Sequence, residues 1–194
     1  MRSSYALNNY ADIFYYNVTV WRPQFCVELG VLDGYSTLAI ARGLKENVKI
    51  GVSGHLDAYD LFDDYEFNHG SMPAVQAELD KAGVSGFVTL HKADAFEAHK
   101  NHEDQTITFL HVDLSNTGET LRRIIQLWDA KICQGGIFMF EGGTEERDQV
   151  EWMIKYNKVP IKPEVENNPI LNDKYVYGTY LKYPGVTCFL KKRL

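Results

Sequence analysis

An acid and two glycines lie close together near the start of the chain, in the run Glu28-Leu-Gly30-Val-Leu-Asp-Gly34. An apolar run precedes them and the hydroxyl residues Ser36 and Thr37 follow, which predicts a strand, a tight turn and the start of a helix. Backbone N–H groups at a helix start attract negative ligand groups, and glycine allows a ligand to approach the backbone closely. We therefore expect a site for a nucleoside-containing ligand at this turn.

The turn differs from the dinucleotide-binding pattern G-x-G-x-x-G, because Leu32 occupies the position of its second glycine. It resembles instead the first motif of class I S-adenosylmethionine-dependent methyltransferases, acid-x-Gly-x-x-x-Gly. The longer stretch VELGVLDGYSTLAIARGL, residues 27–44, is similar to the small O-methyltransferases of the catechol, caffeoyl-CoA and macrocin type. The alternative interpretation is an ordinary strand-to-helix turn of an α/β protein.

This resemblance implies S-adenosylmethionine as the cofactor, with Glu28 or the turn beside it holding the amino group. Lys92-Ala-Asp94-Ala95 is similar to the family's Gly-Asp-Ala, where the acid and the next N–H meet the adenine. The family also places an acid after the second strand, where we expect Gly51-Val52-Ser53, with Asp57 or Asp60 as substitutes. The expected cofactor-binding residues are Glu28, Gly30, Gly34, Tyr35, Ser36, Ser53, Asp94, Ala95 and Asp113.

The catalytic pattern of the family is only partly present. Metal-dependent members carry an Asp after the fourth strand and an Asp-Asp or Asp-Asn pair after the fifth, which hold a divalent ion against the acceptor hydroxyl. This chain has Asp113 at the first place and Glu141-Gly142 at the second, while Asn116 stands where the catechol enzymes carry a lysine base. Because a carboxylate can remove a hydroxyl proton, we expect Asp113 and Glu141 to be catalytic. No residue is assigned to a metal, and the use of a divalent ion stays open.

Apolar runs along the chain predict the elements that must position these residues. The expected strands cover residues 24–29, 48–53, 87–92, 106–113 and 137–140. The expected helices cover residues 4–18, 36–44 and 73–82 and begin again near Asn116 and Thr144. Asn116 and Glu119 have the spacing of a capping box. The polar segment 54–72 is expected to be a functional loop that helps to form the acceptor pocket.

Two β-rich runs, residues 174–182 and 186–190, flank Pro184-Gly185, which predicts a closing hairpin. Alternating strands and helices predict an α/β fold. The resemblance implies the Rossmann-like class I methyltransferase fold, a mostly parallel seven-stranded sheet with a C-terminal antiparallel hairpin. We expect a single domain over residues 1–194, with an N-terminal helical segment, residues 1–22, packed on it.

Composition narrows the classes of partner. A formal net charge of −6 argues against nucleic acid, whose phosphates bind Lys and Arg. The chain has no apolar run of about 18 residues and no cleavage-site pattern at its start, so we expect no membrane partner and a cytoplasmic location. Cys26, Cys133 and Cys188 lack metal-type spacing and are expected to be buried thiols. The expected partner is a small-molecule acceptor, and homo-oligomerisation stays open.

Two hypotheses on function remain. The first is a methyltransferase acting on oxygen of a small polar molecule such as a sugar or phenol. The second is a binding protein that keeps the fold without turnover, because Ser53, Ser115, Asn116 and Gly142 depart from the family pattern. A nucleic-acid base methyltransferase is disfavoured, since Asp113-Leu-Ser-Asn116 stands where such enzymes carry Asp/Asn-Pro-Pro-aromatic.

Overall fold

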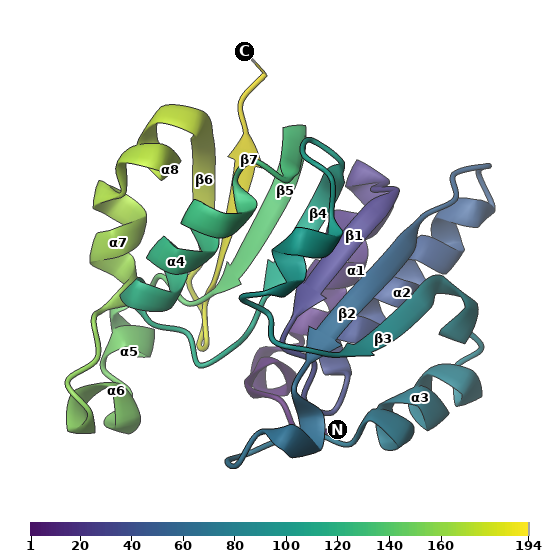
Figure 1. The fold of residues 1–194 in the computed structure, drawn as a ribbon, viewed down its shortest axis with the longest axis horizontal. Coiled ribbons are helices and arrows are strands. Elements are labelled where there is room, and N and C mark those ends of the chain that lie inside the picture. The colour runs from purple at the N-terminus through teal and green to yellow at the C-terminus, as the bar shows by residue number, and fades with distance from the viewer. Residues whose placement is uncertain (194) are drawn as a thin grey trace. The chain divides into compact units, whose positions relative to one another are not determined.

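The computed structural model describes residues 1–193 and divides into two compact units, unit one (Met1–Ala98) and unit two (His99–Leu194). The strands of unit one are β1 (Phe25–Leu29), β2 (His55–Asp60) and β3 (Val88–Lys92) (Figure 1). Those of unit two are β4 (Ile107–Val112), β5 (Ile132–Glu141), β6 (Tyr175–Tyr180) and β7 (Val186–Lys191). The strand order is β3-β2-β1-β4-β5-β7-β6, in one seven-stranded sheet.

The direction of the strands follows the predicted pattern. Within unit one, β1 pairs with β2 and β2 with β3, both in parallel. Within unit two, β4 and β5 are parallel, whereas β7 is antiparallel to both β5 and β6. A mostly parallel seven-stranded sheet with a closing antiparallel hairpin is therefore confirmed. The single domain over residues 1–194 stays a prediction.

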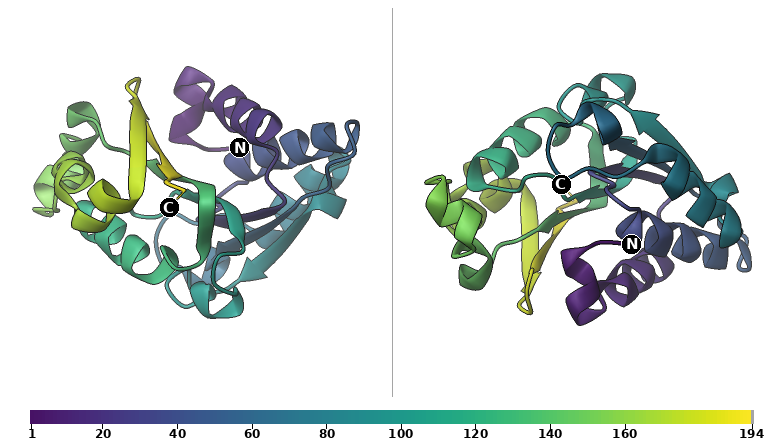
Figure 2. Two further views of the ribbon diagram at one scale, coloured as in Figure 1. Left: turned by 90° about the horizontal axis from the view of Figure 1, so that it is seen from above. Right: turned by 90° about the horizontal axis from the view of Figure 1, so that it is seen from below.

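The helices of unit one begin with the 3₁₀ turn η1 (Ser4–Asn8) and the helix α1 (Tyr10–Trp21), where one helix was expected. They continue with α2 (Tyr35–Val48), η2 (Phe62–Asp64), α3 (Met72–Lys81) and η3 (Ser85–Phe87). Figure 2 shows α1 beside α2. Gly43 allows this contact, because a Cβ there would lie 2.7 Å from Cγ1 of Val18. The Asn47 side chain also donates to the Val18 carbonyl at 3.0 Å.

The second strand is where the sequence prediction is wrong. The expected strand 48–53 is the end of α2 and a turn, and β2 instead lies at His55–Asp60, inside the expected long loop. Its apolar residues Leu56 and Ala58 are buried, and its polar residues pair with β3. His55 Nε2 contacts Thr89 Oγ1 at 2.8 Å, and Asp57 contacts His91 Nε2 at 2.8 Å. Cross-strand polar pairs of this kind stabilise a strand that looks like a loop in sequence.

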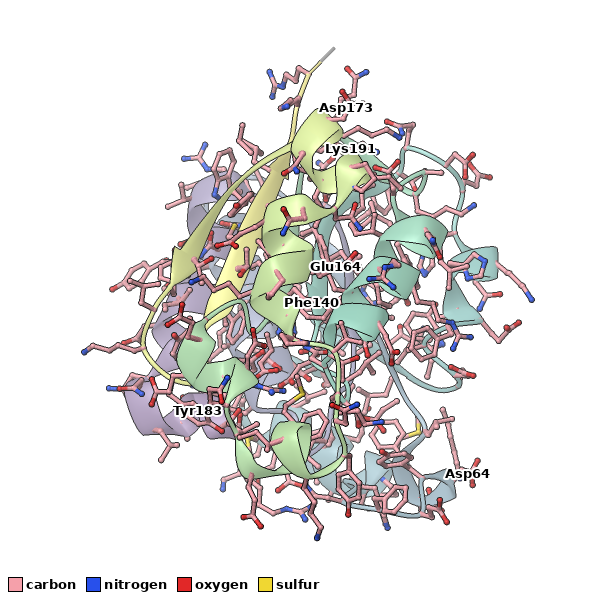
Figure 3. All side chains as sticks on the ribbon, turned by 90° about the vertical axis from the view of Figure 1, so that its left-hand side faces the viewer. Asp64, Phe140, Glu164, Asp173, Tyr183 and Lys191 are labelled. Carbon is pink, nitrogen blue, oxygen red and sulfur yellow. The ribbon has the colours of Figure 1, made fainter. Side chains whose placement is uncertain are left out.

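Unit two carries the short 3₁₀ turn η4 (Ala98–Asn101), which begins in unit one, and five helices. These are α4 (Gly118–Trp128), α5 (Glu145–Asp148), α6 (Glu151–Lys155), α7 (Ile161–Asn167) and α8 (Pro169–Lys174). One apolar face of α4 is buried, formed by Leu121, Ile124, Ile125 and Trp128. Glu164 on α7, labelled in Figure 3, pairs with Arg122 of α4 at 2.5 Å.

The start of α4 differs from the predicted capping box. Thr117, one residue after Asn116, is the N-cap, and its hydroxyl accepts from the Thr120 N–H at 3.1 Å. The side chain of Asn116 is engaged elsewhere, with the ends of β4 and β5. The helix expected near Thr144 does begin there, since Thr144 caps α5 by accepting from the Arg147 N–H.

A buried charge network joins the end of α4 to the last strand. Asp129, the C-cap of α4, pairs with Lys191 of β7 at 3.0 Å and with Lys174 at 2.5 Å, and it accepts from the Tyr175 hydroxyl at 2.9 Å. Lys191 also donates to the Ile132 carbonyl at 2.9 Å. Figure 3 labels Lys191. Burial alone would raise the pKa of Asp129, but the hydrogen bonds from Lys174, Lys191 and Tyr175 lower it.

The three cysteines are free thiols of different exposure. Cys26 is buried, as predicted, whereas Cys133 and Cys188 are half-buried. Burial raises the pKa of all three, that of Cys188 to about 11.

Over residues 1–193, no helix combines the length and the apolar character that a membrane span requires.

Candidate functional site

The glycine turn links β1 to α2 through backbone conformations that favour glycine. Gly30 and Gly34 have φ of 91° and 81°, and Leu32 between them has φ of 50°. The Gly30 N–H donates to the Tyr59 carbonyl at 2.9 Å, which continues the pairing of β1 with β2. The Gly34 N–H donates back to Val31 at 2.8 Å and closes the turn. The predicted sequence of strand, tight turn and helix is thus present.

Asp60, at the end of β2, holds this turn in place. Its Oδ2 accepts from the backbone N–H groups of Val31 at 2.7 Å and Leu32 at 3.0 Å, and its Oδ1 accepts from Phe62 at 2.7 Å. A carboxylate offers about four lone-pair sites, so Asp60 keeps the capacity to accept a further hydrogen bond. The second strand therefore ends on an acid, Asp60.

Ser53 was expected at that place, and this expectation is wrong because the second strand was misplaced. Ser53 precedes β2, and the next residue, Gly54, lies against Pro23, before the start of β1. Ser53 is therefore at the opposite end of the strands from the glycine turn. The alternation of Leu56 and Ala58 with polar residues, followed by an acid, was the signal that pointed to Asp60.

Glu28 is fully buried and contacts the first turn of α2. The Thr37 hydroxyl donates to its Oε2 at 2.5 Å, so the acid of the motif ties β1 to the helix that follows the turn. Ser36 is also buried. Two of the expected cofactor residues, Glu28 before the turn and Ser36 after it, are thus buried.

The start of α2 offers hydrogen-bond donors. The first N–H groups of a helix, here those of Tyr35, Ser36 and Thr37, have no acceptor within the helix, and the N-cap Gly34 has no side chain to supply one. Together with the helix dipole, such donors favour a negative group. Gly34 is also required sterically, since a Cβ there would lie 2.8 Å from Cγ1 of Val75.

The third strand brings Asp94 and Ala95 to the same edge. β3 ends at Lys92 in parallel register with β2, and the Ala93 N–H donates to the Asp60 carbonyl at 3.0 Å. Asp94 is exposed and accepts from the Phe96 N–H at 2.8 Å, while Ala95 is buried. The turns after β1, β2 and β3 therefore lie at one edge of unit one, as the carboxyl ends of parallel strands do.

The segment after β2 is fastened onto the glycine turn by Arg2 and Gly70. The Arg2 guanidinium donates to both oxygens of Asp33, at 2.8 and 3.0 Å, and also to Asn68 and the His69 carbonyl. A Cβ on Gly70 would lie only 1.7 Å from the Leu32 carbonyl oxygen. The hydrogen bond from Arg2 is the main cause that lowers the pKa of Asp33, to about 2.

A cavity of about 580 Å³ lies on the helical side of unit one. Of the residues expected to bind cofactor, only Tyr35 lines it, so it is a neighbour of the glycine turn and not the edge described above. Its walls come from the N-terminus, α1, α2 and α3 and are formed by Met1, Ala11, Asp33, Tyr35, Leu38, Ala39, Arg42, Ser71, Ala74, Val75 and Glu78.

In unit two, the predicted catalytic acids lie at the ends of β4 and β5. Asp113 follows β4 and is half-buried. Glu141 ends β5, is buried, and receives two hydrogen bonds from Arg147, Nε to Oε1 at 2.6 Å and Nη2 to Oε2 at 3.0 Å. Burial raises the pKa of Glu141, while the charge and hydrogen bonds of Arg147 act in the opposite direction. Arg147 was not predicted from the sequence.

Asn116 links the two strand ends. Its side-chain nitrogen donates to the carbonyls of Val112 at 3.1 Å and Glu141 at 3.0 Å, and its oxygen accepts from the Leu114 N–H at 3.0 Å. Its role is therefore to hold the backbone. Within residues 1–193, no three His, Cys, Asp or Glu side chains are grouped so that they could hold a metal ion.

Comparisons with known proteins identify the family. A protein-family model described as a methyltransferase domain matches residues 27–141, which is more than half of the chain and includes the glycine turn, Asp60, Asp94, Asp113 and Glu141. The chain belongs to the methyltransferase domain family. The resemblance to class I methyltransferases stated from the glycine turn is thereby confirmed. No curated protein matches the sequence.

Solved structures of low sequence identity share the fold. A methyltransferase from Geobacter sulfurreducens is 13% identical with a TM-score of 0.67, over 96% of this chain and 79% of that one. A putative caffeoyl-CoA O-methyltransferase from Staphylococcus aureus is 12% identical with a TM-score of 0.68, over 95% and 83%. The O-methyltransferase TomG from Streptomyces achromogenes, solved with S-adenosylmethionine, is 14% identical with a TM-score of 0.68, over 95% and 80%.

Proposed function

We propose that the protein is an S-adenosylmethionine-dependent methyltransferase that methylates an oxygen of a small polar molecule, such as a sugar or a phenol. The observation that carries the proposal is the glycine turn, which is fastened to Asp60 and leads into the donor-rich start of α2. The O-methyltransferases of similar fold support oxygen as the target. A small-molecule acceptor and a cytoplasmic location remain our predictions.

The residues of unit one fit the proposed cofactor by their chemistry. The N–H groups at the start of α2, with Ser36, suit its carboxylate, and Glu28 or the turn beside it suits its amino group. Asp60 suits the ribose hydroxyls because it keeps acceptor capacity, and Asp94 with the Ala95 N–H suits the adenine. Gly30 and Gly34 leave the backbone open to the ligand, and Tyr35 borders the turn. When bound, S-adenosylmethionine supplies an electrophilic methyl group on a positively charged sulfur.

The residues of unit two suit the acceptor chemistry. Methyl transfer needs the acceptor oxygen aligned with the methyl group, and much of the barrier can be lowered by positioning and exclusion of water. We assign Asp113 as the base that takes the acceptor's proton, since it follows β4 and is half-buried. Glu141 would act in the same site through its ion pair with Arg147. Asp113 also stays a candidate for cofactor binding.

The first experiment is a calorimetric titration with S-adenosylhomocysteine. We expect the wild-type protein to bind it and Asp60→Asn to bind it about tenfold or more weakly, because the turn and the ribose lose a charged acceptor. Asp80→Asn is the control: Asp80 lies on α3, is exposed, and its side chain accepts from Gln76 at 3.1 Å, so this variant should bind S-adenosylhomocysteine as the wild type does. No heat at millimolar ligand would contradict the proposal.

A methyl-transfer assay then separates the two hypotheses on function. The bound protein is incubated with methyl-labelled S-adenosylmethionine and a panel of phenols, catechols and sugars. Transfer to any of these hydroxyl compounds supports the enzyme. Binding without transfer across the whole panel favours the catalytically degenerate binding protein.

A further inference from the structure

Arg147, in unit two, has one buried nitrogen that the fold leaves without a hydrogen-bond partner. Arg147 is only 5% exposed, and three of its contacts are accounted for, with both oxygens of Glu141 and with the Asn116 carbonyl at 3.3 Å. Its remaining nitrogen, Nη1, is buried and has no hydrogen-bond partner. A buried charged donor without an acceptor is unfavourable and is rare in folded proteins. A hydrogen-bond acceptor on a bound ligand would give Nη1 the partner that it lacks.

The surroundings of Arg147 are those of an acceptor site. Burial acts to lower the pKa of Arg147, but the charge and hydrogen bonds of Glu141 raise it, and the charge of Asp113, the proposed base, adds to this rise. Tyr183, in the connection between β6 and β7 and labelled in Figure 3, contributes in the same direction. The ring of Trp152 lies against the guanidinium, with its centroid 5.2 Å from Cζ. A cation, a carboxylate and aromatic rings therefore gather at the ends of β4 and β5.

The ion pair with Arg147 also engages the oxygens of Glu141 that would otherwise be available to a divalent cation. In the family pattern, acids after the fourth and fifth strands hold a divalent cation against the acceptor hydroxyl. In this chain both oxygens of Glu141 accept from a guanidinium, which is a permanent cation. A fixed positive group thus already lies beside the acids. Donors preorganised toward a developing oxyanion stabilise it strongly in a buried site.

We propose that Arg147 binds the methyl acceptor through Nη1 and stabilises the oxyanion that forms when the acceptor's hydroxyl loses its proton. This inference rests on the proposed function and assigns an acceptor-binding residue to that site. The hydroxyl proton passes to Asp113. The oxyanion then forms a bond to the methyl carbon while the carbon–sulfur bond breaks, and its electron pair stays on sulfur, which leaves S-adenosylhomocysteine and a methyl ether.

Access to Nη1 requires a side chain to move, because the atom has no exposed surface. Trp152 is the neighbour that we assign to this movement. It is half-buried and lies on α6, a helix of five residues. An aromatic ligand could replace part of the contact that the Trp152 ring makes with the guanidinium.

The test compares two aromatic probes of similar size, para-nitrophenol and para-nitrobenzyl alcohol, in the presence of saturating S-adenosylhomocysteine. The pH is set so that the phenol is ionised and the alcohol is not. We expect the wild-type protein to bind para-nitrophenolate about tenfold more tightly than para-nitrobenzyl alcohol. The phenolate oxygen is charged and accepts a strong hydrogen bond from Arg147, whereas the neutral alcohol cannot make an equally strong one. The phenolate absorption band reports binding directly.

The main variant removes both charges, Arg147→Gln with Glu141→Gln, because Arg147→Gln alone would leave Glu141 buried without its partner. We expect the affinity ratio of the two probes to fall to about one, while the affinity for S-adenosylhomocysteine is unchanged. Arg147→Lys keeps the charge without the planar guanidinium and should give an intermediate ratio. Arg122→Gln, at an exposed arginine paired with Glu164, is the control and should keep the wild-type ratio.

Three results would overturn the inference: failure of the phenolate to bind while S-adenosylhomocysteine is bound, equal affinity of the wild type for both probes, or a wild-type ratio in the double variant. Failure of S-adenosylhomocysteine itself to bind would instead reject the proposed function, so the two can be told apart.

Discussion

Among single residues, Arg2 makes an unusual number of contacts for an exposed side chain. It donates to Asp33, to Asn68 and to the His69 carbonyl, and its own backbone N–H also donates to Asp33 at 2.7 Å. Asp33 belongs to the glycine turn, so the second residue of the chain is bonded to the segment proposed to hold the cofactor. An arginine fork on a carboxylate favours the charged form of the acid.

This contact predicts a pH effect with a definite sign. The pKa of Asp33 is lowered to about 2, so the pair stabilises the folded state above the ordinary pKa of an aspartate, and this stabilisation is lost as the pH falls toward 2. Arg2→Ala should raise the pKa of Asp33 to near its ordinary value, and Arg2→Lys should raise it less. Carboxyl NMR titration of Asp33 measures both. An unchanged pKa in Arg2→Ala would show that Arg2 is not the cause.

For single residues, the sequence predicted which residues lie at the strand ends better than it predicted which side chains contact one another. Gly30, Gly34 and Asp94 were placed on the correct turns and Glu28 at the end of β1, because glycines and acids after apolar runs mark strand ends. Arg147 was missed, since an arginine in a charged run reads as a surface residue. Only the fold shows that it is buried against Glu141, and no local pattern signals such a pair.

Between elements, the network around Asp129 holds α4 and β7 together. Lys191 is almost fully buried, and Asp129 is its charge partner. Removal of one member of a buried pair leaves the other charge unpaired in a poorly solvated place. The network therefore matters more than a surface ion pair of the same length.

Asp129→Ala should destabilise the protein by about 3 kcal/mol, because Lys191 then stays buried without a counter-charge. Asp104→Ala is the matched control. Asp104 pairs with Lys131 at 2.7 Å but is 67% exposed, and such pairs contribute under about 1 kcal/mol. Urea denaturation measures both free energies of unfolding. Equal effects of the two substitutions would mean that the buried network contributes no more than the exposed pair.

Element boundaries were predictable where the apolar pattern was regular. The closing hairpin was predicted correctly, and β2 was not, because its polar side chains are stabilised by partners on β3 that are distant in sequence. The run 48–53 looked like a strand because it is rich in valine and isoleucine. Its turn at Gly51, with φ of 78°, instead ends α2.

For the whole molecule, the sequence predicted the family and the fold class, and the family model and the strand order confirm both. The two compact units leave the single-domain prediction open to experiment.

Two substitutions test this prediction. Gly70→Ala in unit one introduces a close contact with the Leu32 carbonyl, so the backbone must shift. Asp129→Ala perturbs unit two.

If residues 1–194 unfold as one domain, both substitutions should lower the midpoint of a single thermal transition, and circular dichroism and tryptophan fluorescence should report the same midpoint. Gly86→Ala is the control for the glycine, since a Cβ there meets nothing within 4 Å. A variant that splits the transition into two steps would show that the units unfold separately.

The raised pKa values of the three thiols have a practical consequence for labelling. Burial lowers the thiolate fraction of all three at neutral pH below that of a free cysteine, and the thiolate is the form that reacts with alkylating dyes. A cysteine introduced at an exposed place such as Asn68, whose side chain accepts from Arg2, should react faster than the native three. The protein is therefore suited to carry a single fluorescent reporter of ligand arrival without removal of its own cysteines.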